Sequence, residues 1–383
     1  MPSTYTLDAD ACLGLVPQRC DECLKACEQD AIDIDMQPEI VEEDVGAIIL
    51  ATGYDLYPIE KMAEYGYGKH EDVIDGLQLE QLINPSGPIG GGVRRPSDGK
   101  VPKHVVFVQC VGSRDPELHK SYCSKICCMY MTKLATLYKK IVPDGHAYVL
   151  YIDIRAAGKD YEEFVQRAME ESHVLYIRGK VSKIFREKDK LMVWGADTLT
   201  GKKIEIAADM VVLAMAIVPS EGTAELAKSL RISTGPDGFL KEVHPKLRPV
   251  ETLTAGMYIA GASQAPKDIP ETVAHAGGAA SKAIGLVSAP ELEHAPTVVN
   301  IDELICSGCG ICIPQCPYNA LKLNGKDVAE VNEVICEGCG VCSAACPSGA
   351  IQLKNLTDEQ IFKMVEGGLS TTTKGGIEYA RKI

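Results

Sequence analysis

The chain has 383 residues, 46% of them hydrophobic, and a formal net charge of −14, values that fit a globular protein of two or three domains. It contains no apolar run of transmembrane length and no secretion signal within its first ten residues, so we expect a cytoplasmic protein. The excess of acidic residues argues against a general nucleic-acid-binding surface, and no nucleic-acid partner is expected.

Cysteine is the most informative residue type. The reducing cytosol disfavours disulfides, so the sixteen cysteines need another role. They fall into three groups, with four before residue 30, four between 110 and 128, and eight between 306 and 346. If each cubic cluster takes four thiolates, the groups predict four [4Fe–4S] clusters. A chain with four such clusters conducts electrons.

Residues 1–40 are the first predicted domain, a ferredoxin-like module for one cluster. Cys20, Cys23 and Cys27 keep the spacing that ends a ferredoxin motif, and AIDI follows where such a motif continues into a strand. Cys12 lies farther upstream than in ferredoxins, and Cys27 is expected to close the same cube. A zinc site and a module that has lost its cluster are the alternatives.

An incomplete FAD domain is predicted from residues 41–103 and 216–290. Residues 45–57 form an apolar strand with Ala-Thr-Gly at its end, which resembles the strand of two-dinucleotide-binding-domain flavoproteins that leads into the dinucleotide crevice. This pattern places Thr52 and Gly53 at the flavin. An ordinary parallel strand is the alternative.

Residues 104–215 read as alternating strands and helices, the pattern of a nicotinamide-binding lobe. The strand at 104–109 runs into cysteine instead of a glycine fingerprint, and we expect the next helix to open at Cys123, with Cys127 on the same helical face. Cysteines therefore occupy the place of a pyrophosphate at a helix N-terminus. The predicted ligands of this non-ferredoxin cluster are Cys110, Cys123, Cys127 and Cys128. Buried structural thiols are the alternative.

Residues 252–285 read as the closing strand, loop and helix of the FAD domain. In disulfide reductases this strand ends in Gly-Asp, whose carboxylate binds the flavin ribityl chain, but here the aspartate is replaced by alanine. Glycines and alanines at 277–280 permit close approach to flavin, although simple helix–sheet packing explains them equally. The flavin contacts expected from this segment are Gly261, Ala262, Gln264, Asp268 and Ile269.

The strongest pattern lies in residues 291–355, predicted to be a two-cluster ferredoxin domain. It contains C-x2-C-x2-C-x3-C-P twice, and in such motifs the fourth cysteine reaches the other cube. The first predicted cluster has the ligands Cys306, Cys309, Cys312 and Cys346. The second has the ligands Cys336, Cys339, Cys342 and Cys316. Duplicated spacing with both prolines disfavours a disulfide framework or a pair of zinc sites. Residues 356–383 are expected to form a helix capped by Thr357 and a polar tail.

Several segments together resemble the A-type subunit of heterodisulfide reductase, the flavin-containing iron–sulfur component of electron-bifurcating complexes. They are VVFVQCVGSRD and YCSKICCMYMTK around the middle cysteines, LYIDIRAAGKDYEEF at 150–164 and QAPKDIPETVAHA at 264–276. The resemblance implies that the middle cysteines hold an unusual cluster close to the flavin. It also implies that Lys133 lies near flavin N5 and tunes its reduction potential. A solvent-facing helix lysine is the alternative.

Family members hold the FAD adenosine diphosphate on a strand–G-x-G-x-x-G–helix unit, and this sequence contains no such fingerprint. We therefore expect a split subunit, in which a second polypeptide supplies the glycine-rich half and FAD lies at the junction. The expected fold is a partial, thioredoxin-reductase-like α/β flavoprotein core with ferredoxin-like modules at both ends. Cysteine in place of the nicotinamide fingerprint disfavours an NAD(P)H-dependent oxidoreductase.

The resemblance implies an oxidoreductase component that passes electrons between FAD, ferredoxin and a heterodisulfide-reducing or analogous module. It also implies several partners: B- and C-type heterodisulfide reductase subunits, a hydrogenase or formate dehydrogenase, and ferredoxin, in a dimer of heteromers. The alternative function is a flavin-free iron–sulfur relay scaffold between a dehydrogenase or hydrogenase and a reductase.

Overall fold

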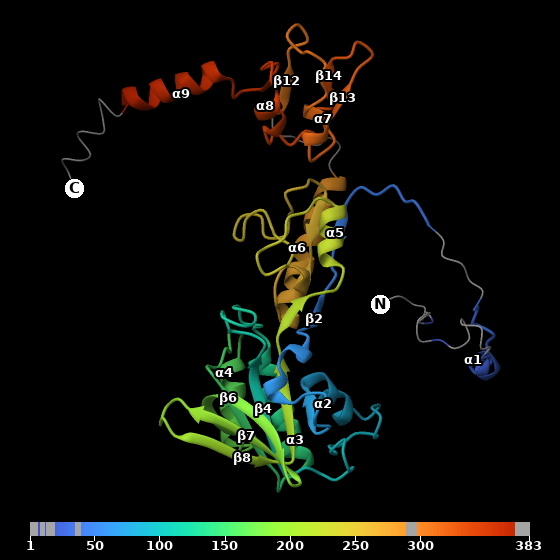
Figure 1. Ribbon diagram of the computed structural model, residues 1–383, viewed down its shortest axis with the longest axis vertical. Helices are drawn as coiled ribbons and strands as arrows, with labels where there is room; N and C mark the ends of the chain where they lie inside the picture. The colour runs from blue at the N-terminus through green and yellow to red at the C-terminus, as the bar shows by residue number, and fades with distance from the viewer. Residues whose placement is uncertain (1–6, 8–11, 13–19, 35–39, 289–296, 372–383) are drawn as a thin grey trace. The chain divides into compact units, whose positions relative to one another are not determined.

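The computed structural model describes Leu7, Cys12 and residues 20–34, 40–288 and 297–371 (Figure 1). The chain divides into two units, Met1–Val45 and Gly46–Ile383. In the described part of the first unit, the helix α1 (Glu22–Ala26) ends directly before Cys27. No helix in the described ranges is long and apolar enough to cross a membrane.

A seven-stranded sheet, ordered β3-β9-β4-β5-β6-β7-β8, is the largest element of the second unit. The first five strands in this order are mutually parallel, and β7 and β8 continue antiparallel. The strands are β3 (Val73–Asp75), β4 (His104–Val111), β5 (His146–Tyr151), β6 (Leu175–Glu187), β7 (Lys190–Asp197), β8 (Lys203–Ala208) and β9 (Met210–Met215). The central strands β4 and β9 are almost wholly buried, as expected where a parallel sheet is covered on both faces.

Helices α2 (Gly76–Ile83) and α3 (Cys127–Ile141) pack into one hydrophobic core with Phe107 of the sheet. The α3 side chains Met131, Leu134 and Tyr138 are fully buried in it. A second core on the sheet contains Val106 and Leu213 together with residues of the η1 (Ile59–Lys61) and η2 (Ala63–Tyr65) turns. The short helix α4 (Tyr161–Glu170) lies between β5 and β6 in the chain.

The placement of β3 and α2 differs from the sequence-based expectation, which put residues 41–103 in the FAD domain. Val73 and Ile74 are buried, and β3 pairs in parallel with β9. Apolar burial at the sheet edge therefore joins this segment to the lobe predicted at 104–215.

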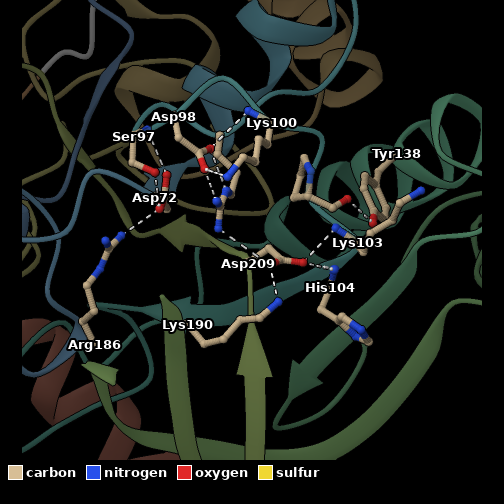
Figure 2. A network of polar contacts seen from close by, with 12 residues as sticks. Asp72, Ser97, Asp98, Lys100, Lys103, His104, Tyr138, Arg186, Lys190 and Asp209 are labelled. Carbon is tan, nitrogen blue, oxygen red and sulfur yellow. Dashed lines mark hydrogen bonds and ion pairs between the residues drawn. The ribbon is translucent and has the colours of Figure 1, made fainter. Parts of the chain in front are cut away.

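Two aspartates secure the amino-terminal edge of the large sheet (Figure 2). Asp209 accepts hydrogen bonds from the backbone N–H groups of Lys103 (2.8 Å) and His104 (2.9 Å) and pairs with Lys190. Burial raises the pKa of the Asp209 carboxyl, but these partners outweigh it and hold the pKa below its usual value. Asp72 is 1% exposed and pairs with Arg186 at 2.8 Å. Because β4 starts at His104 and carries Cys110 near its other end, this network is far along the strands from the middle cysteines.

A smaller parallel layer contains β1 (Ile48–Leu50) and β11 (Met257–Ile259). The helix α5 (Thr223–Ser229) packs with Leu50 and Ile259, and α6 (Ile269–Ser288) packs with Tyr258 and Ala260. The strand predicted over 45–57 is thus two strands, because Gly53 takes a left-handed conformation (φ 74°) before β2 (Tyr54–Leu56). β2 pairs antiparallel with β10 (Ile217–Pro219).

The C-terminal part has two interleaved repeats. β12 (Val299–Ile301) pairs antiparallel with β15 (Ile351–Leu353), and β13 (Leu321–Leu323) with β14 (Ala329–Val331). In the chain, α7 (Cys312–Gln315) lies between β12 and β13, and α8 (Val341–Ala345) lies between β14 and β15. The last described helix, α9 (Asp358–Thr371), is capped by Thr357 as predicted, with Gln360 as the reciprocal partner.

Candidate iron–sulfur and flavin sites

Two small pockets in the C-terminal part are each lined by four cysteines. Cys316 joins the three cysteines of the second motif in one pocket, and Cys346 joins those of the first motif in the other. The first pocket contains Cys316, Cys336, Cys339 and Cys342, and the second contains Cys306, Cys309, Cys312 and Cys346. Antiparallel pairing of β12 with β15 brings the ends of the two repeats together, and the grouping is the one that ferredoxin spacing predicts.

Glycine is structurally required in the loops between the first two cysteines of each motif. Gly308 has φ 65°, and a Cβ there would lie 2.2 Å from the carbonyl oxygen of Asp327. Gly338 has φ 61°, and its Cβ would lie 1.9 Å from the carbonyl oxygen of Thr297. Both positions combine a left-handed backbone with a close backbone approach, so no side chain fits without displacing the loop.

The last cysteine of a motif accepts hydrogen bonds from groups that follow it in the chain. The Ala320 N–H donates to Cys316 Sγ at 3.3 Å, and Ala31 N–H donates to Cys27 Sγ at the same distance and the same four-residue separation. Burial raises the pKa of Cys346, but hydrogen bonds from Ser348 and from neighbouring backbone N–H groups lower it by more. The net pKa therefore lies below the ordinary thiol value. Such donors stabilise thiolate, the form that binds metal.

The four middle cysteines are held by the carboxyl end of β4, the following loop and the start of α3. Cys110 has φ 61° at an irregularity in the pairing of β4 with β9. The expectation that a helix opens at Cys123 is wrong, since α3 begins at Cys127. The reason is local: Lys125 adopts φ 65°, and the Ser124 hydroxyl accepts the Ile217 N–H at 2.9 Å. Cys123 therefore lies in the loop, not on the same helical face as Cys127.

The four middle thiols are close enough to affect one another electrostatically. Burial, with the neighbouring cysteines as a further cause, raises the pKa of Cys110 to about 11 and raises the pKa of Cys127 still more. The pKa of Cys128 is also raised, first by burial. The raised pKa values favour the protonated thiols of Cys110, Cys127 and Cys128, and a bound metal centre would supply the positive charge that displaces their protons.

The surroundings of these thiols suit a thiolate-bound cluster. Cys123 Sγ accepts the Lys125 N–H at 3.3 Å, and Cys128 Sγ accepts the Arg155 N–H at 3.4 Å. Ser113 Oγ and Gln109 Oε1 are buried beside this segment without a hydrogen-bond partner. Sulfide and thiolate atoms can accept hydrogen bonds from the Lys125 and Arg155 N–H groups and from the Ser113 hydroxyl, so these donors fit an iron–sulfur cluster. The Gln109 amide oxygen can only accept and is not one of these donors. Within the described ranges, no three His, Cys, Asp or Glu side chains are arranged to hold a single metal ion.

The structure brings several predicted flavin contacts to one edge. β1 and β11 are parallel with Leu50 opposite Ile259, so the residues after them emerge together at their carboxyl ends. Thr52 is exposed, Gly53 and Gly261 both have positive φ, and Ala262 is buried. Carboxyl ends of parallel strands are where open α/β sheets bind ligands.

The polar residues predicted to replace the missing aspartate already have protein partners. Gln264 Nε2 donates to Glu242 Oε2 at 2.9 Å, and its amide oxygen accepts from Lys267. Asp268 caps α6 by accepting the Glu271 N–H at 2.9 Å, and it also accepts the Tyr161 hydroxyl at 3.1 Å. Ile269 is one of the most exposed apolar residues of the described chain.

Lys133 lies on α3, and its ammonium pairs with Glu80 Oε1 of α2 at 2.6 Å. Its side chain is half exposed. Within the described ranges, it forms no ion pair or hydrogen bond with residues at the carboxyl ends of β1 and β11. Its proposed position near flavin N5 stays a prediction.

Sequence reasoning missed two contacts at the amino end of α6. Lys125, between two of the middle cysteines, forms an ion pair with Glu271. His275 Nδ1 accepts the Gly261 N–H at 3.0 Å, which leaves its Nε2–H to donate to the Pro249 carbonyl at 3.1 Å. Lys125 and His275 lie within segments that resemble the heterodisulfide reductase family, but only the tertiary structure shows their partners.

The fold and the cysteine geometry together define an α/β protein with an iron–sulfur domain. Comparisons with known proteins show which proteins of this class the chain resembles. Residues 305–350 match the 4Fe-4S dicluster domain family. The chain is 47% identical, over 98% of its length, to the A-type iron–sulfur subunit of CoB–CoM heterodisulfide reductase from Methanocaldococcus jannaschii, of which it covers 57%. It is 48% identical, over 84% of its length, to the A-type subunit of H(2):CoB-CoM heterodisulfide,ferredoxin reductase from Methanothermobacter thermautotrophicus, of which it covers 48%.

The chain is a homologue of the A-type subunit of heterodisulfide reductase, and it spans about half the length of the curated relatives it matches. Among solved structures, thioredoxin reductase of T. acidophilum matches with 15% identity and a TM-score of 0.41 over 63% of this chain and 65% of that one. The chain's own sheet topology confirms the α/β class, and the family match at residues 305–350 confirms the C-terminal dicluster domain. The two-dinucleotide-domain arrangement stays a prediction.

Proposed function

We propose that this chain is an electron-transferring part of a heterodisulfide reductase A-type subunit, which passes electrons between FAD, ferredoxin and a heterodisulfide-reducing or analogous module. The observation that carries the proposal is the gathering of four mutually interacting thiols at the carboxyl end of β4, in a homologue of that protein. Cys127 and Cys128 are buried, and Cys110 and Cys123 are half-buried beside them, an arrangement that suits the thiolate ligands of one cluster.

Sixteen cysteines are proposed to hold four [4Fe–4S] clusters, each of which, when bound, exchanges single electrons. The sets are Cys12, Cys20, Cys23 and Cys27; Cys110, Cys123, Cys127 and Cys128; Cys306, Cys309, Cys312 and Cys346; and Cys316, Cys336, Cys339 and Cys342. The protein's own part is to bury the sulfurs, to donate backbone N–H groups to them and to fix their directions by glycine turns and helix starts.

FAD is proposed to lie at the carboxyl edge of β1 and β11, and it supplies, when bound, the ability to exchange both electron pairs and single electrons. The chain residues proposed to position it are Thr52, Gly53, Lys133, Gly261, Ala262, Gln264, Asp268 and Ile269. A second polypeptide with the G-x-G-x-x-G fingerprint is proposed to complete the site. The other proposed partners are B- and C-type subunits, ferredoxin, and a hydrogenase or formate dehydrogenase, in a cytoplasmic dimer of heteromers.

The test measures iron, acid-labile sulfide and flavin per chain in the anaerobically purified native complex. The double substitution Cys127→Ala/Cys128→Ala should remove about four irons, the content of one cube. The control is Met129→Ala, a half-buried neighbour in the same turn that should retain all the iron. Unchanged iron in the double variant would make the middle cysteines structural.

The flavin measurement separates the proposal from its alternative. Flavin that is released by denaturation in stoichiometric amount supports the FAD-containing protein. A complex with full iron but no flavin would instead be an iron–sulfur relay scaffold between a dehydrogenase or hydrogenase and a reductase.

A further inference from the structure

Two arginines and an aspartate lie beside the middle cysteines, at the carboxyl edge of the large sheet. Cys110 is near the end of β4, and Asp153 lies just after β5. Because β4 and β5 are parallel neighbours, the segments that follow them emerge at the same edge. There Arg114 Nη1 forms an ion pair with Asp153 Oδ1, and Arg155 Nε lies 3.6 Å from the same oxygen. Arg114, Asp153 and Arg155 are called the Arg–Asp–Arg group below.

The loop after β4 fixes the backbone of Arg114. This residue is left-handed, with φ 57°, and its N–H donates to the Tyr122 carbonyl at 2.9 Å. The Asp115 N–H donates to the Lys120 carbonyl at 3.0 Å, and the Lys120 N–H donates to the Gly112 carbonyl at 3.1 Å. Residues other than glycine are seldom left-handed, and they keep such a conformation only where the surroundings enforce it. The guanidinium therefore extends from a constrained turn.

The segment after β5 contacts the sulfur of Cys128 through its backbone. The Arg155 N–H donates to Cys128 Sγ at 3.4 Å, and the Asp153 carbonyl oxygen lies 3.7 Å from the same sulfur. Cys128 itself is buried at the start of α3. Two members of the Arg–Asp–Arg group thus belong to residues that touch a middle cysteine.

The third member, Arg114, acts electrostatically on several of these thiols. Burial raises the pKa of Cys110 and that of Cys128, and the Arg114 guanidinium opposes the rise at both. Burial lowers the pKa of the arginine itself, but Asp153 and the thiols of Cys110 and Cys123 raise it by more. Asp153 acts in the opposite direction to Arg114 and raises the pKa of Cys128. The arginine therefore favours negative charge on the sulfurs, and the aspartate disfavours it.

We propose that the Arg–Asp–Arg group sets the reduction potential of the [4Fe–4S] cluster held by the middle cysteines, and that Arg114 is the positioning residue that raises it. This inference rests on the proposed function, in which those cysteines bind that cluster. Reduction adds one electron to the bound cluster and breaks no bond, so its negative charge increases by one unit. The electron comes from the proposed flavin, or from dithionite in a titration. A nearby positive charge stabilises the more negative, reduced form and so raises the potential.

The group should act mainly through Arg114. Two guanidinium groups and one carboxylate leave a net charge of one positive unit beside the sulfurs. The Arg114 side chain is 21% exposed, whereas those of Asp153 and Arg155 are 41% and 50% exposed. Solvent therefore screens the charge of Arg114 least. Arg155 contributes through its backbone N–H, which no side-chain substitution removes.

The test is a dithionite titration of the anaerobically purified native complex, followed by EPR spectroscopy. The signal that is absent from the Cys127→Ala/Cys128→Ala variant identifies the middle cluster. Arg114→Gln removes the positive charge and should lower the ratio of reduced to oxidised cluster at a fixed potential about tenfold, which is about 59 mV for a one-electron couple. Asp153→Asn removes the negative charge and should raise the ratio about threefold, because this carboxylate is more exposed to solvent.

Two matched controls separate charge near the sulfurs from other effects. Arg178→Gln removes a positive charge at an exposed residue whose Nε donates to the Ile152 carbonyl at 3.0 Å, directly before Asp153 in the chain. It should leave the potential unchanged. Arg114→Lys keeps the charge without the planar guanidinium and should keep the ratio within about threefold of the wild type. Iron content is measured for every variant.

Opposite shifts for Arg114→Gln and Asp153→Asn, in variants with full iron, support the proposal. Unchanged potentials, or shifts in the same direction, overturn it and leave the proposed function standing. Loss of about four irons from both variants would show a structural role and also overturn it. If only one variant loses iron, the direction of the shift in the other decides. A wild-type complex without a signal that depends on Cys127 and Cys128 would contradict the proposed function itself, and this inference with it.

Discussion

The C-terminal pockets and the middle cysteine group are both proposed to hold iron–sulfur clusters, and they are constructed differently. In the C-terminal part, each pocket is made by short repeats whose loops are shaped by glycines such as Gly308 and Gly338. In the middle group, Cys110 and Cys127 come from a strand end and a helix start on a seven-stranded sheet. The first arrangement is local in the chain, and the second depends on the packing of a large core.

This difference predicts different weaknesses. A ferredoxin-type site should fail when its own loop is changed and should tolerate changes elsewhere. The middle site should fail when the core under α3 is weakened, because the backbone near Cys110 and Lys125 is held in left-handed conformations that packing must enforce.

The largest effect is expected for Gly308→Ala. Its Cβ would lie 2.2 Å from the Asp327 carbonyl, whereas Gly310, with φ 71°, has no atom within 4 Å of an added Cβ. Gly308→Ala should therefore lose about four irons, while Gly310→Ala should keep them and cost about 1 kcal/mol of backbone strain. Iron analysis and the thermal unfolding of both variants measure this. Similar behaviour of the two variants would mean that steric closeness does not shape the site.

The next effect is expected for Met131→Ala, which removes a fully buried side chain one turn below Cys127 and Cys128. The cavity should lower the free energy of unfolding by about 2–5 kcal/mol. We expect about four irons to be lost from the middle site, while those of the C-terminal pockets are retained. Met169→Ala, at a partly exposed position of α4, is the control. Loss of C-terminal iron instead would contradict the independence of the two constructions.

The same contrast explains what sequence alone could predict. The ferredoxin grouping was predictable because spacing within one repeat fixes the geometry, and the crossing of Cys316 and Cys346 follows from the repeat. The α/β lobe with strands at β4, β5 and β9 was predictable from continuous apolar runs. Periodicity and spacing are local properties, and these features depend on little else.

The parts that sequence missed depend on long-range contacts. The start of α3 was placed at Cys123 because nothing local shows that Ser124 bonds to Ile217 or that Lys125 is left-handed. The assignment of β3 to the large sheet depends on its pairing with β9, more than 130 residues later in the chain. Likewise, spacing could not suggest the pairing of Glu271 with Lys125 or that of His275 with Gly261.

A smaller effect is expected from acidification at His275, which ties α6 to Gly261. Burial lowers the pKa of this imidazole from its ordinary 6.5, so the folded state favours the neutral form. Its stabilisation is complete above pH 6.5 and declines as the pH falls toward the lower folded pKa. His275→Gln should cost about 1 kcal/mol and remove this part of the pH dependence. Unfolding followed at several pH values measures it, and a pH profile unchanged by the substitution would contradict the lowered pKa of His275.

The smallest effect is expected at the Lys125–Glu271 pair, which joins the loop of the middle cysteines to the start of α6. Both side chains are partly exposed, at 40% and 37%, so solvent screens their attraction. A double-mutant cycle with Lys125→Met and Glu271→Gln should give a coupling below about 1 kcal/mol, reduced further in high salt. A coupling of several kcal/mol that resists salt would mean that a buried charge contact, in addition to core packing, fixes the middle site. The contrast with the self-contained ferredoxin loops would then lie in electrostatics as well as in packing.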